Sequence, residues 1–450
     1  MRRQAMWWMF TVLFVVLTSP LRAEEAGWTS LFNGKDLSGW ASLNLPAGTF
    51  YVRDGILITR GHPTGVIRSD KQYENFILEM EWKHIEKLGN SGLFVWSDGI
   101  PAPGSPYCRC IEVQVLNGLE SDNYTSHGDV FALNGTVMKP DRPHPLGWMR
   151  CLPSERRANG TGEWNHYRVE CRNGRLTLAV NGKVVSGGSG ITPRKGYLCL
   201  ESEGAEAHFR NIRIQELPST NPQPSEICKT AWDFEMLYNG LDLNGWKTPA
   251  NMSGWEAKDA RILCNGKGLT GSEGTLWSPL EYENFQLSID WHWAGKPTER
   301  LKPVFLPSGE IDTDATKQPK QVKVQDAGES GILLRGSDKA RVALWCLPGG
   351  SGTIEGYRAD KSQPADVRAA CTASKRADEQ FFMGRKVLVC NPNRTLITVE
   401  DDHVTVEING KIVIKSAKLP GLPSKGRFGL QNLGSGVEFS NIFIRPLAKK

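Results

Sequence analysis

Leu176-Thr177-Leu178-Ala179-Val180-Asn181-Gly182-Lys183-Val184-Val185 is the stretch that decides the fold class. Its Leu and Val side chains alternate with Thr and Ala, and this period of two is typical of a β-strand. The central Asn-Gly tolerates the positive φ angles of a type I′ turn, so the stretch predicts a β-hairpin. The same pattern returns at residues 404–413. Long amphipathic helical stretches are absent, and many short strands between turn signals predict an all-β protein of sandwich or jelly-roll type.

An internal repeat divides the 450-residue chain into two units. Five motif pairs occur in the same order in both units: residues 31–40 and 237–246, 73–76 and 282–285, 90–93 and 329–332, 181–185 and 409–413, and 209–212 and 439–442. A period of about 200 residues is too long for a solenoid and predicts two folded domains. We expect these at residues 27–217 and 232–447, joined by a Pro/Ser-rich linker at 218–231. An insert in the second unit, at 294–328, is expected in a surface loop.

The N-terminus has the pattern of a cleavable export signal. A short basic segment precedes an apolar run from Met6 to Leu17, and a small residue follows at Ala23. Because this run is too short to span a bilayer comfortably, residues 1–23 predict a signal peptide. The protein is therefore expected to be secreted or periplasmic, and no later stretch predicts a membrane span.

The charge distribution argues against nucleic acid as a partner. The chain has 54 Lys and Arg residues and 49 Asp and Glu residues, a formal net charge of +5. The basic residues are scattered and form no run or stripe, so the electrostatic pattern of a nucleic-acid interface is missing.

Ten cysteines in an exported chain allow disulfides. We expect bridges among those in or beside longer loops: Cys108, Cys110, Cys151, Cys346 and Cys371. Cys171, Cys199 and Cys264 lie in strand-like runs and are expected in the core as free thiols. The sequence does not fix the pairing.

The stretch 110–116 is the most informative strand of the first unit. Because successive side chains of a strand point to opposite faces, its three β-branched residues face a core. Glu112 and Gln114 then lie on the other face, about 7 Å apart. Glu and Gln are poor strand formers, and a jelly roll offers a concave face for ligands. We interpret the pair as a site that grips hydroxyl groups or transfers a proton; an ordinary solvent-facing strand is the alternative.

Loops downstream of this strand supply further candidates. His127 is the candidate general base because its unperturbed pKa lies near neutrality, although it can equally be a histidine that bonds a neighbouring backbone group. Trp148 either stacks on a sugar ring or plugs the edge of the sandwich. The other candidate substrate-binding residues are Asp129, Arg142, His144, Arg150 and Glu201. No cofactor is evident, because histidine spacings such as HxH or HExxH are absent; a calcium ion held by loop carboxylates would leave no sharp signature.

The sequence resembles a known family at these residues. The resemblance is carried by residues 31–40, Asn90-Ser91-Gly92, Glu112-Val113-Gln114, 162–165 and 209–212. They are similar to the DUF1080 domain, a family associated with 3-keto-disaccharide hydrolase (3-keto-glycoside 1,2-lyase/hydratase) activity. The resemblance implies tandem concanavalin A-like lectin/glucanase sandwiches and secreted bacterial carbohydrate breakdown. The loop at 127–130 is similar to loops of planctomycete members.

The implied reaction needs a base, an acid and a group that polarises an enolate. A ketone at sugar C3 acidifies the C2 hydrogen, so a base removes it while an acid protonates the leaving glycosidic oxygen. We expect Glu112 or His127 as base or acid, Gln114 and Arg150 as binders of hydroxyl or enolate oxygens, and Trp148 as a stacking platform. The alternative is a non-catalytic, lectin-like carbohydrate-binding protein, since one sandwich fold serves both lectins and enzymes.

The second unit departs from this pattern. Aligned with 110–116 it has 341–347, so that Ala343 stands opposite Glu112 and Trp345 opposite Gln114. We expect this unit to bind sugar only. A site built from other residues is the alternative, and its candidates are Glu329, Arg335, Glu355, Tyr357 and Arg358.

Overall fold

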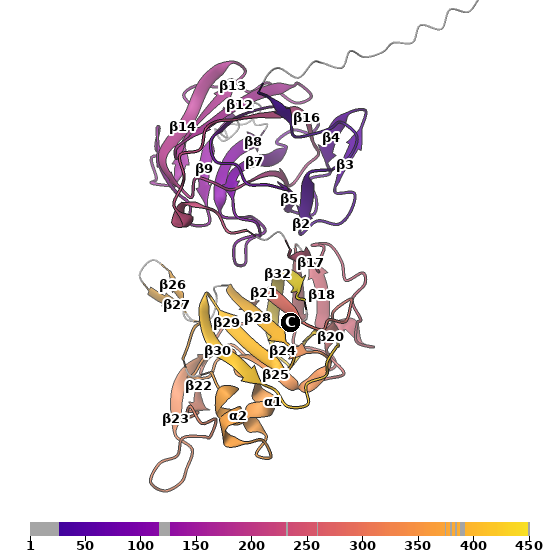
Figure 1. Cartoon of the computed structure of the whole chain (residues 1–450), viewed down its shortest axis with the longest axis vertical. Coiled ribbons are helices and arrows are strands. Elements are labelled where there is room, and N and C mark those ends of the chain that lie inside the picture. Colours follow the sequence, from indigo (N-terminus) through magenta and orange to yellow (C-terminus); the bar gives the residue numbers. More distant parts are fainter. Residues whose placement is uncertain are drawn as a thin grey trace, which may run out of the picture.

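Two β-sandwiches make up the protein (Figure 1). The computed structural model describes residues 27–116, 127–230, 233–258, 260–373, 375–378, 380–382, 385–387 and 392–448. The predicted signal peptide at 1–23 lies outside the described residues. The all-β class is confirmed: the strand pairs are antiparallel, and the helices among the described residues are short.

The first sandwich consists of a back sheet and a front sheet. The 9-stranded back sheet has the order β10 (Val137–Pro140), β14 (Lys183–Thr192), β13 (Arg175–Val180), β12 (Asn165–Arg172), β6 (Phe76–His84), β16 (Ala207–Glu216), β4 (Ile56–Thr59) and β3 (Phe50–Arg53), with β1 (Thr29–Ser30) paired to β16. The 7-stranded front sheet has the order β11 (Arg150–Cys151), β9 (Val130–Leu133), β8 (Cys110–Leu116), β7 (Asn90–Ser97), β15 (Tyr197–Ser202), β5 (Gly65–Ser69) and β2 (Trp40–Leu43).

The second sandwich repeats this plan with a smaller front sheet. Its 8-stranded back sheet has the order β18 (Trp255–Lys258), β19 (Arg261–Asn265), β32 (Gly436–Pro446), β21 (Phe285–Trp293), β28 (Asn393–Glu400), β29 (His403–Ile408) and β30 (Lys411–Lys418), with β17 (Glu235–Met236) paired to β32. Its 4-stranded front sheet has the order β20 (Leu276–Trp277), β31 (Gly429–Leu430), β24 (Glu329–Leu334) and β25 (Ser337–Trp345). The remaining elements are the hairpins β22 (Thr298–Pro303)–β23 (Gln321–Asp326) and β26 (Gln380–Phe382)–β27 (Arg385–Val387), the 3-10 turns η2 (Pro224–Glu226) and η3 (Met252–Gly254), and the helices α1 (Glu355–Ala359) and α2 (Ala365–Ala370).

Both predicted hairpins form. Strands β13 and β14 meet at Asn181 and Gly182, whose φ angles are 47° and 88°. Asn409 and Gly410 join β29 to β30 with φ angles of 50° and 78°. Both central positions of each turn are thus left-handed, the conformation for which Asn-Gly is preferred.

The repeated motif at 31–40 and 237–246 has a structural explanation. In the first copy the indole N–H of Trp40 donates to the carbonyl of Leu31 at 2.7 Å. In the second copy Trp246 donates to Leu237 at 3.2 Å. The motif therefore closes a turn at the start of each sandwich, which explains why the two copies are alike without any shared chemistry.

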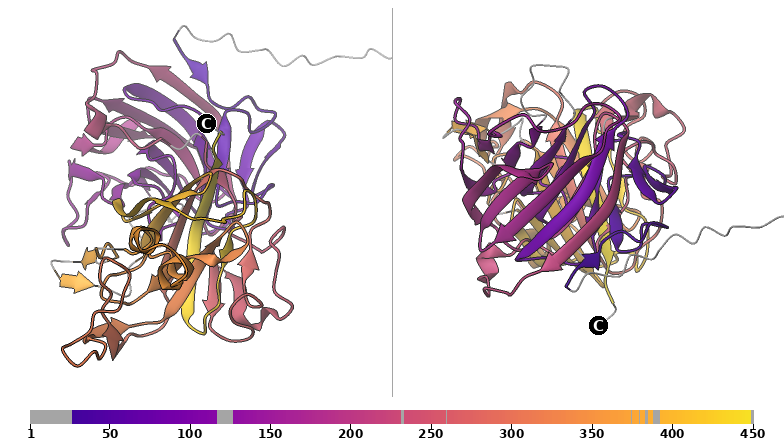
Figure 2. Two further views of the ribbon diagram at one scale, coloured as in Figure 1. Left: turned by 60° about the horizontal axis from the view of Figure 1, so that its bottom comes forward. Right: turned by 90° about the horizontal axis from the view of Figure 1, so that it is seen from above.

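The second sandwich docks with its back sheet against the front sheet of the first. Phe443 of β32 packs in one apolar cluster with Val66 of β5 and Phe94 of β7, flanked by Met236 of β17. In Figure 1 the back-sheet strands β17, β21 and β32 accordingly lie at the top of the second sandwich, while α1 and α2 lie at its far end. The views in Figure 2 show the same stacking from two further directions. The arrangement is head-to-tail: the back of one sandwich covers the front of the other.

A buried ion pair anchors this docking. Asp290 of β21 is fully buried and accepts from Arg394 Nε at 2.7 Å and from the Gly104 amide at 2.9 Å. Arg394 also donates to the carbonyl of Pro101 at 2.8 Å. The side chain of Asn441 bonds the Ser105 carbonyl at 2.9 Å and Asp290 at 2.7 Å. The loop between β7 and β8 is therefore held by the second sandwich.

The predicted linker lies against the first sandwich. The hydroxyls of Ser219 and Thr220 donate to the carboxylate of Glu74. Further along, the Cys228 thiol donates to the carbonyl of Trp96 at 2.9 Å. The segment is thus fixed by hydrogen bonds rather than only stiffened by its prolines.

The expectation of disulfides is wrong. Nine cysteines are described, and all are free and buried, including the five expected to bridge, Cys108, Cys110, Cys151, Cys346 and Cys371; Cys390 lies outside the described residues. These thiols pack as small apolar groups, or bond the backbone. The Cys151 sulfur, for example, accepts the amide of Gly187 at 3.4 Å.

Candidate functional site

The outer face of the front sheet in the first sandwich carries a polar cluster on strands β7, β8 and β15. As predicted, Ile111, Val113 and Val115 point into the core between the sheets. Glu112 and Gln114 point the other way, but they are only 9% and 7% exposed. The alternative of an ordinary solvent-facing strand is therefore wrong: this face is covered.

Two carboxyl groups meet at a glycine. Gly92 of β7 pairs with Gln114 on β8, and the next pair on the same face is Phe94 with Glu112. A Cβ atom placed on Gly92 would lie 2.8 Å from Glu112 Oε1 and 3.0 Å from Glu201 Oε2. The missing side chain of Gly92 thus leaves the space in which the two carboxyl groups approach each other. Glu201 was a predicted substrate-binding residue, and the structure makes it the partner of Glu112.

A third carboxylate extends the cluster. Glu203 accepts the Tyr107 hydroxyl at 2.8 Å and the side-chain amide of Asn90. The Gln114 amide donates to Asn90 Oδ1 at 2.8 Å, which completes a chain of side-chain hydrogen bonds. Sequence reasoning missed Tyr107, which precedes its strand in a loop without a local motif. Asn90 was visible only as part of a repeated motif.

Burial and crowding keep protons on this cluster. Burial, with the charge of Glu203 second, raises the pKa of Glu112 to about 8. Burial and the charges of Glu112 and Glu203 raise the pKa of Glu201 well above its ordinary value. Glu201 Oε2 also has no hydrogen-bond partner among the described residues. Near neutral pH the Glu112–Glu201 pair therefore carries protons that isolated carboxyl groups would have released.

Arg150 and Asp129 lie on the same face, toward the β11 edge. Arg150 pairs with Phe131 across β11 and β9, and Phe131 pairs with Glu112 across β9 and β8. The Arg150 guanidinium stands 4.8 Å over the Phe131 ring and donates from Nε to Asp129 at 2.6 Å. Burial raises the pKa of Asp129 to about 6, although the arginine opposes this. The structure thus brings Glu112, Gln114, Glu201, Asp129 and Arg150 onto one face.

His127 is oriented elsewhere. It is 1% exposed, and its Nδ1 accepts the amide of Ala158, a residue of the core, at 3.2 Å. Burial, with the charge of Arg156, lowers the pKa of His127. Its Nδ1 lone pair is therefore engaged, and its observed partner is this amide rather than the carboxyl cluster.

The loop between β10 and β11 holds the remaining candidates. His144 is buried and stacks on Trp148, with ring centroids 4.3 Å apart and planes 8° apart. Trp148 is 55% exposed, so it does not plug the edge of the sandwich. Arg142 is exposed on the same loop. These residues form a separate aromatic surface beside β11.

The second sandwich places different residues in the corresponding positions. A Cβ on Gly331 would lie 2.6 Å from Arg341 Cγ and 2.8 Å from Gln431 Oε1, the geometry seen around Gly92. Gly331 pairs with Ala343, and Leu333 pairs with Arg341. The predicted alignment is therefore wrong by two residues: Ala343 corresponds to Gln114, and Arg341 corresponds to Glu112.

The insert and the other candidates of the second unit have structural partners. Phe305 of the insert stacks on Trp345 at 6.3 Å, and the Arg358 guanidinium lies 4.0 Å over the Phe305 ring. Arg358 also pairs with Glu355. Two other candidates bind the backbone: Arg335 donates to the carbonyls of Asp401 and Pro423, and Tyr357 donates to that of Pro420. The Glu329 carboxylate forms an ion pair with the side chain of Arg341.

Neither a metal-ligand cluster nor a membrane-spanning helix occurs in the described ranges. There, no group of three or more His, Cys, Asp or Glu side chains is placed to hold a metal ion. None of the helices in the same ranges is long and apolar enough to cross a membrane.

The sequence comparison with protein families concerns the first sandwich. Residues 27–215 match the sequence profile of the 3-keto-alpha-glucoside-1,2-lyase-like domain. A search of curated proteins found no significant match.

Among solved structures, a candidate glycosyl hydrolase from Parabacteroides distasonis is 24% identical over 43% of this chain and 94% of its own, with a TM-score of 0.32. The carbohydrate-binding module CBM66 from Bacillus subtilis is 15% identical over 40% and 96%, with a TM-score of 0.29. The Bacillus licheniformis β-glucanase is 14% identical over 43% and 94%, with a TM-score of 0.26. The part of the chain that carries the carboxyl cluster, residues 27–215, is therefore similar to the 3-keto-alpha-glucoside-1,2-lyase-like domain family.

Proposed function

We propose that the first sandwich cleaves 3-keto-glycosides by elimination and hydration, with Glu112 as base and Glu201 as acid. The observation that carries this proposal is the Glu112–Glu201 pair at Gly92 within a domain similar to this family. Burial and the neighbouring carboxylates raise the pKa of both groups, that of Glu112 to about 8. Near neutral pH the pair therefore holds a proton for the leaving group, and it gains a carboxylate base as the pH approaches 8.

The chemistry follows from a ketone at C3. The Glu112 carboxylate removes the C2 hydrogen while the C1–oxygen bond breaks and Glu201 protonates the leaving alcohol. A C1=C2 double bond conjugated with the ketone remains. Water then adds its oxygen to C1 and a proton returns to C2, so that glycoside and water become an alcohol and a 3-keto sugar. The side-chain amides of Gln114 and Asn90 lie beside the pair and can bind sugar hydroxyls.

The neighbouring features have supporting roles in this proposal. The exposed Trp148 ring offers a stacking surface for a sugar at the β11 edge. We infer that the second sandwich is a second copy of the domain without this activity, because Arg341 and Gln431 occupy the places of the two carboxyl groups. Export through the predicted signal peptide at 1–23 would place this activity outside the cytoplasm.

The test is release of the 3-keto sugar from 3-keto-maltose and 3-keto-cellobiose by the full chain, with and without a chelator. Glu112→Gln should lower kcat by about 10²- to 10⁴-fold, the usual loss for a proton-transfer group. Its matched control is Glu163→Gln, at an exposed site of the same sandwich. In the wild type, kcat/KM should rise with pH through about 8, as Glu112 ionises.

Two outcomes would reject the proposal. One is wild-type turnover in Glu112→Gln. The other is binding of both sugars by the wild type without release of product, which would establish the lectin-like alternative.

A further inference from the structure

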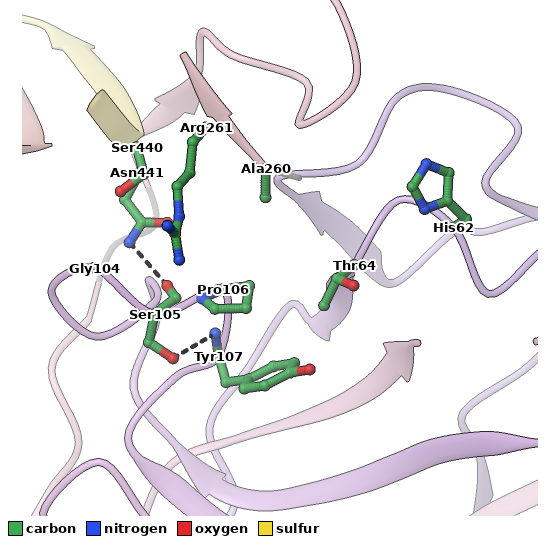
Figure 3. A pocket seen from close by; sticks show the side chains of 10 residues that line it. All are labelled: His62, Thr64, Gly104, Ser105, Pro106, Tyr107, Ala260, Arg261, Ser440 and Asn441. Atoms are coloured by element: carbon green, nitrogen blue, oxygen red, sulfur yellow. Dashed lines mark hydrogen bonds between the residues drawn. The ribbon is translucent and has the colours of Figure 1, made fainter. Parts of the chain in front are cut away.

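A cavity of about 180 Å³ lies between the two sandwiches. Figure 3 shows it from close by: Thr64, Ser105 and Tyr107 line it from the first sandwich, and Arg261, Ser440 and Asn441 from the second. A cavity of this size has room for several water molecules. That volume suits one small polar molecule or one sugar ring rather than a longer chain.

The walls of the cavity are fixed. Asn441 lines it and bonds the carbonyls of Ala102 and Ser105 at 3.1 and 2.9 Å. The amide of Asn44 crosses from the first sandwich to Asn441 Oδ1 at 2.7 Å. The buried Asp290–Arg394 pair holds the same loop. The cavity therefore depends on both sandwiches, and neither forms it alone.

The cavity adjoins the carboxyl cluster. Tyr107 lines it, and the hydroxyl of this residue donates to Glu203 at 2.8 Å. Gly65 pairs with Ser202 across β5 and β15, which places Thr64, another lining residue, beside Glu203. A ligand bound at Glu112 and Glu201 thus has this space next to it along the front sheet.

The chemistry of the lining suits an uncharged hydroxylated ring. It combines the hydroxyl groups of Thr64, Ser105 and Ser440 with the Tyr107 ring and the guanidinium of Arg261. In Figure 3 Arg261 extends from the second sandwich toward the loop that carries Ser105 and Pro106. One of its nitrogens pairs with Glu438 at 2.8 Å, and its side chain is 44% exposed. It is therefore oriented by an ion pair and still accessible to a ligand.

We propose that this cavity is the subsite for the second sugar unit, or hydroxylated leaving group, of the substrate, and that Arg261 of the second sandwich binds it. The inference rests on the proposed function for the position of the first sugar unit. It gives the second sandwich a role: it completes the binding site of the first.

The test compares substrates with a small and a large leaving group in the full chain. For Arg261→Ala, KM for 3-keto-maltose or 3-keto-cellobiose should rise about tenfold, the loss expected for a hydrogen bond from a charged donor. Its kcat, and both constants for methyl 3-keto-glucoside, should stay within about twofold. Arg261→Lys should restore part of the affinity. The matched control is Arg300→Ala, an exposed arginine on the β22–β23 hairpin. An equal effect on both substrate classes, or no effect on either, would overturn the proposal.

Direct binding separates this inference from the proposed function. If the wild type turns over no 3-keto-glycoside, calorimetry with maltose and cellobiose still reports on the cavity. Binding that weakens in Arg261→Ala but not in Arg300→Ala supports the subsite. Equal binding by the wild type and Arg261→Ala, or no binding by the wild type, refutes it.

Discussion

At the scale of single residues, Glu112 has a position that costs stability. It is 9% exposed, and it lies beside Glu201 and near Glu203. Ordinary solvent-exposed glutamates release their protons several pH units lower. Such a group, kept where its charged form is disfavoured, is typical of functional sites, although structural networks also produce it.

We predict that replacing the Glu112 carboxyl group increases stability, and that the gain depends on pH. The folded-state pKa of Glu112, about 8, exceeds the unfolded value, so the stabilisation from its bound proton is full at low pH and is lost as pH rises toward 8. Glu112→Gln removes this loss. We expect it to raise the free energy of unfolding at pH 8 by roughly 1–3 kcal/mol, with little change at pH 4. Denaturant unfolding at both pH values measures this.

The exposed Glu163→Gln is the control for that experiment and should change stability little at either pH. A Glu112→Gln variant that is equally or less stable than the wild type at pH 8 would show that burial of this carboxyl carries no such cost.

At the scale of elements, strand β8 and its counterpart β25 show what an alternating pattern predicts and what it leaves open. The face that Glu112 occupies followed from alternation alone, and both hairpins followed from alternation together with the central Asn-Gly. The equivalence of Glu112 with Arg341 did not. A shift of two residues along a strand leaves each side chain on its original face, so the pattern cannot distinguish the two alignments. Only the pairing of Gly92 and Gly331 with their neighbours fixes the register.

Other parts of the site depend on tertiary contacts that no local pattern encodes. Tyr107 reaches Glu203 from a loop held by the second sandwich. Disulfides were expected for the five cysteines near loops because an exported chain meets an oxidising compartment. Their packing, which the sequence does not show, makes them buried free thiols. His127 was favoured for its ordinary pKa, whereas its surroundings engage one ring nitrogen.

The two equivalent glycines allow a matched test of the carboxyl pair. The methyl group of Gly92→Ala would displace the carboxyl groups of Glu112 and Glu201, which are flexible side-chain ends and can move without unfolding the strand. We expect kcat to fall by at least about tenfold, because a displacement near 1 Å can cost that or more. Steady-state kinetics on 3-keto-maltose measures the effect, and circular dichroism checks the fold.

Gly331→Ala places the same methyl group against Arg341 and Gln431 in the second sandwich. It should leave kcat unchanged. Equal losses of activity in the two variants would mean that the carboxyl pair is not the reacting centre.

At the scale of the whole molecule, one sheet face has two different uses. In the first sandwich the outer face of the back sheet carries partly exposed ion pairs, such as Arg168 and Arg213 with Glu79. In the second sandwich the same face carries Phe443 and the buried Asp290–Arg394 pair, and it covers the front of the first sandwich.

Breaking the buried pair should separate the sandwiches. Arg394→Ala leaves the carboxylate of Asp290 buried without its cation, which typically costs about 3–5 kcal/mol. We expect a lower melting temperature and a larger radius of gyration in small-angle scattering. Arg168→Ala is the control: its partner Glu79 keeps Arg213, and a pair exposed to this degree contributes about 1 kcal/mol or less. Unchanged scattering and stability in Arg394→Ala would exclude the anchoring role.

The head-to-tail docking also has a consequence for biosynthesis. The first sandwich is complete in sequence once β16 is made, yet its front sheet carries apolar side chains that pack against Met236 of β17 and Phe443 of β32. Strand β32 is synthesised more than two hundred residues later. At about 5–20 residues per second, the ribosome needs on the order of 10–40 s to reach it. During that interval a nascent chain exposes the apolar front of its first half, and we expect it to be prone to aggregation at this stage of translation.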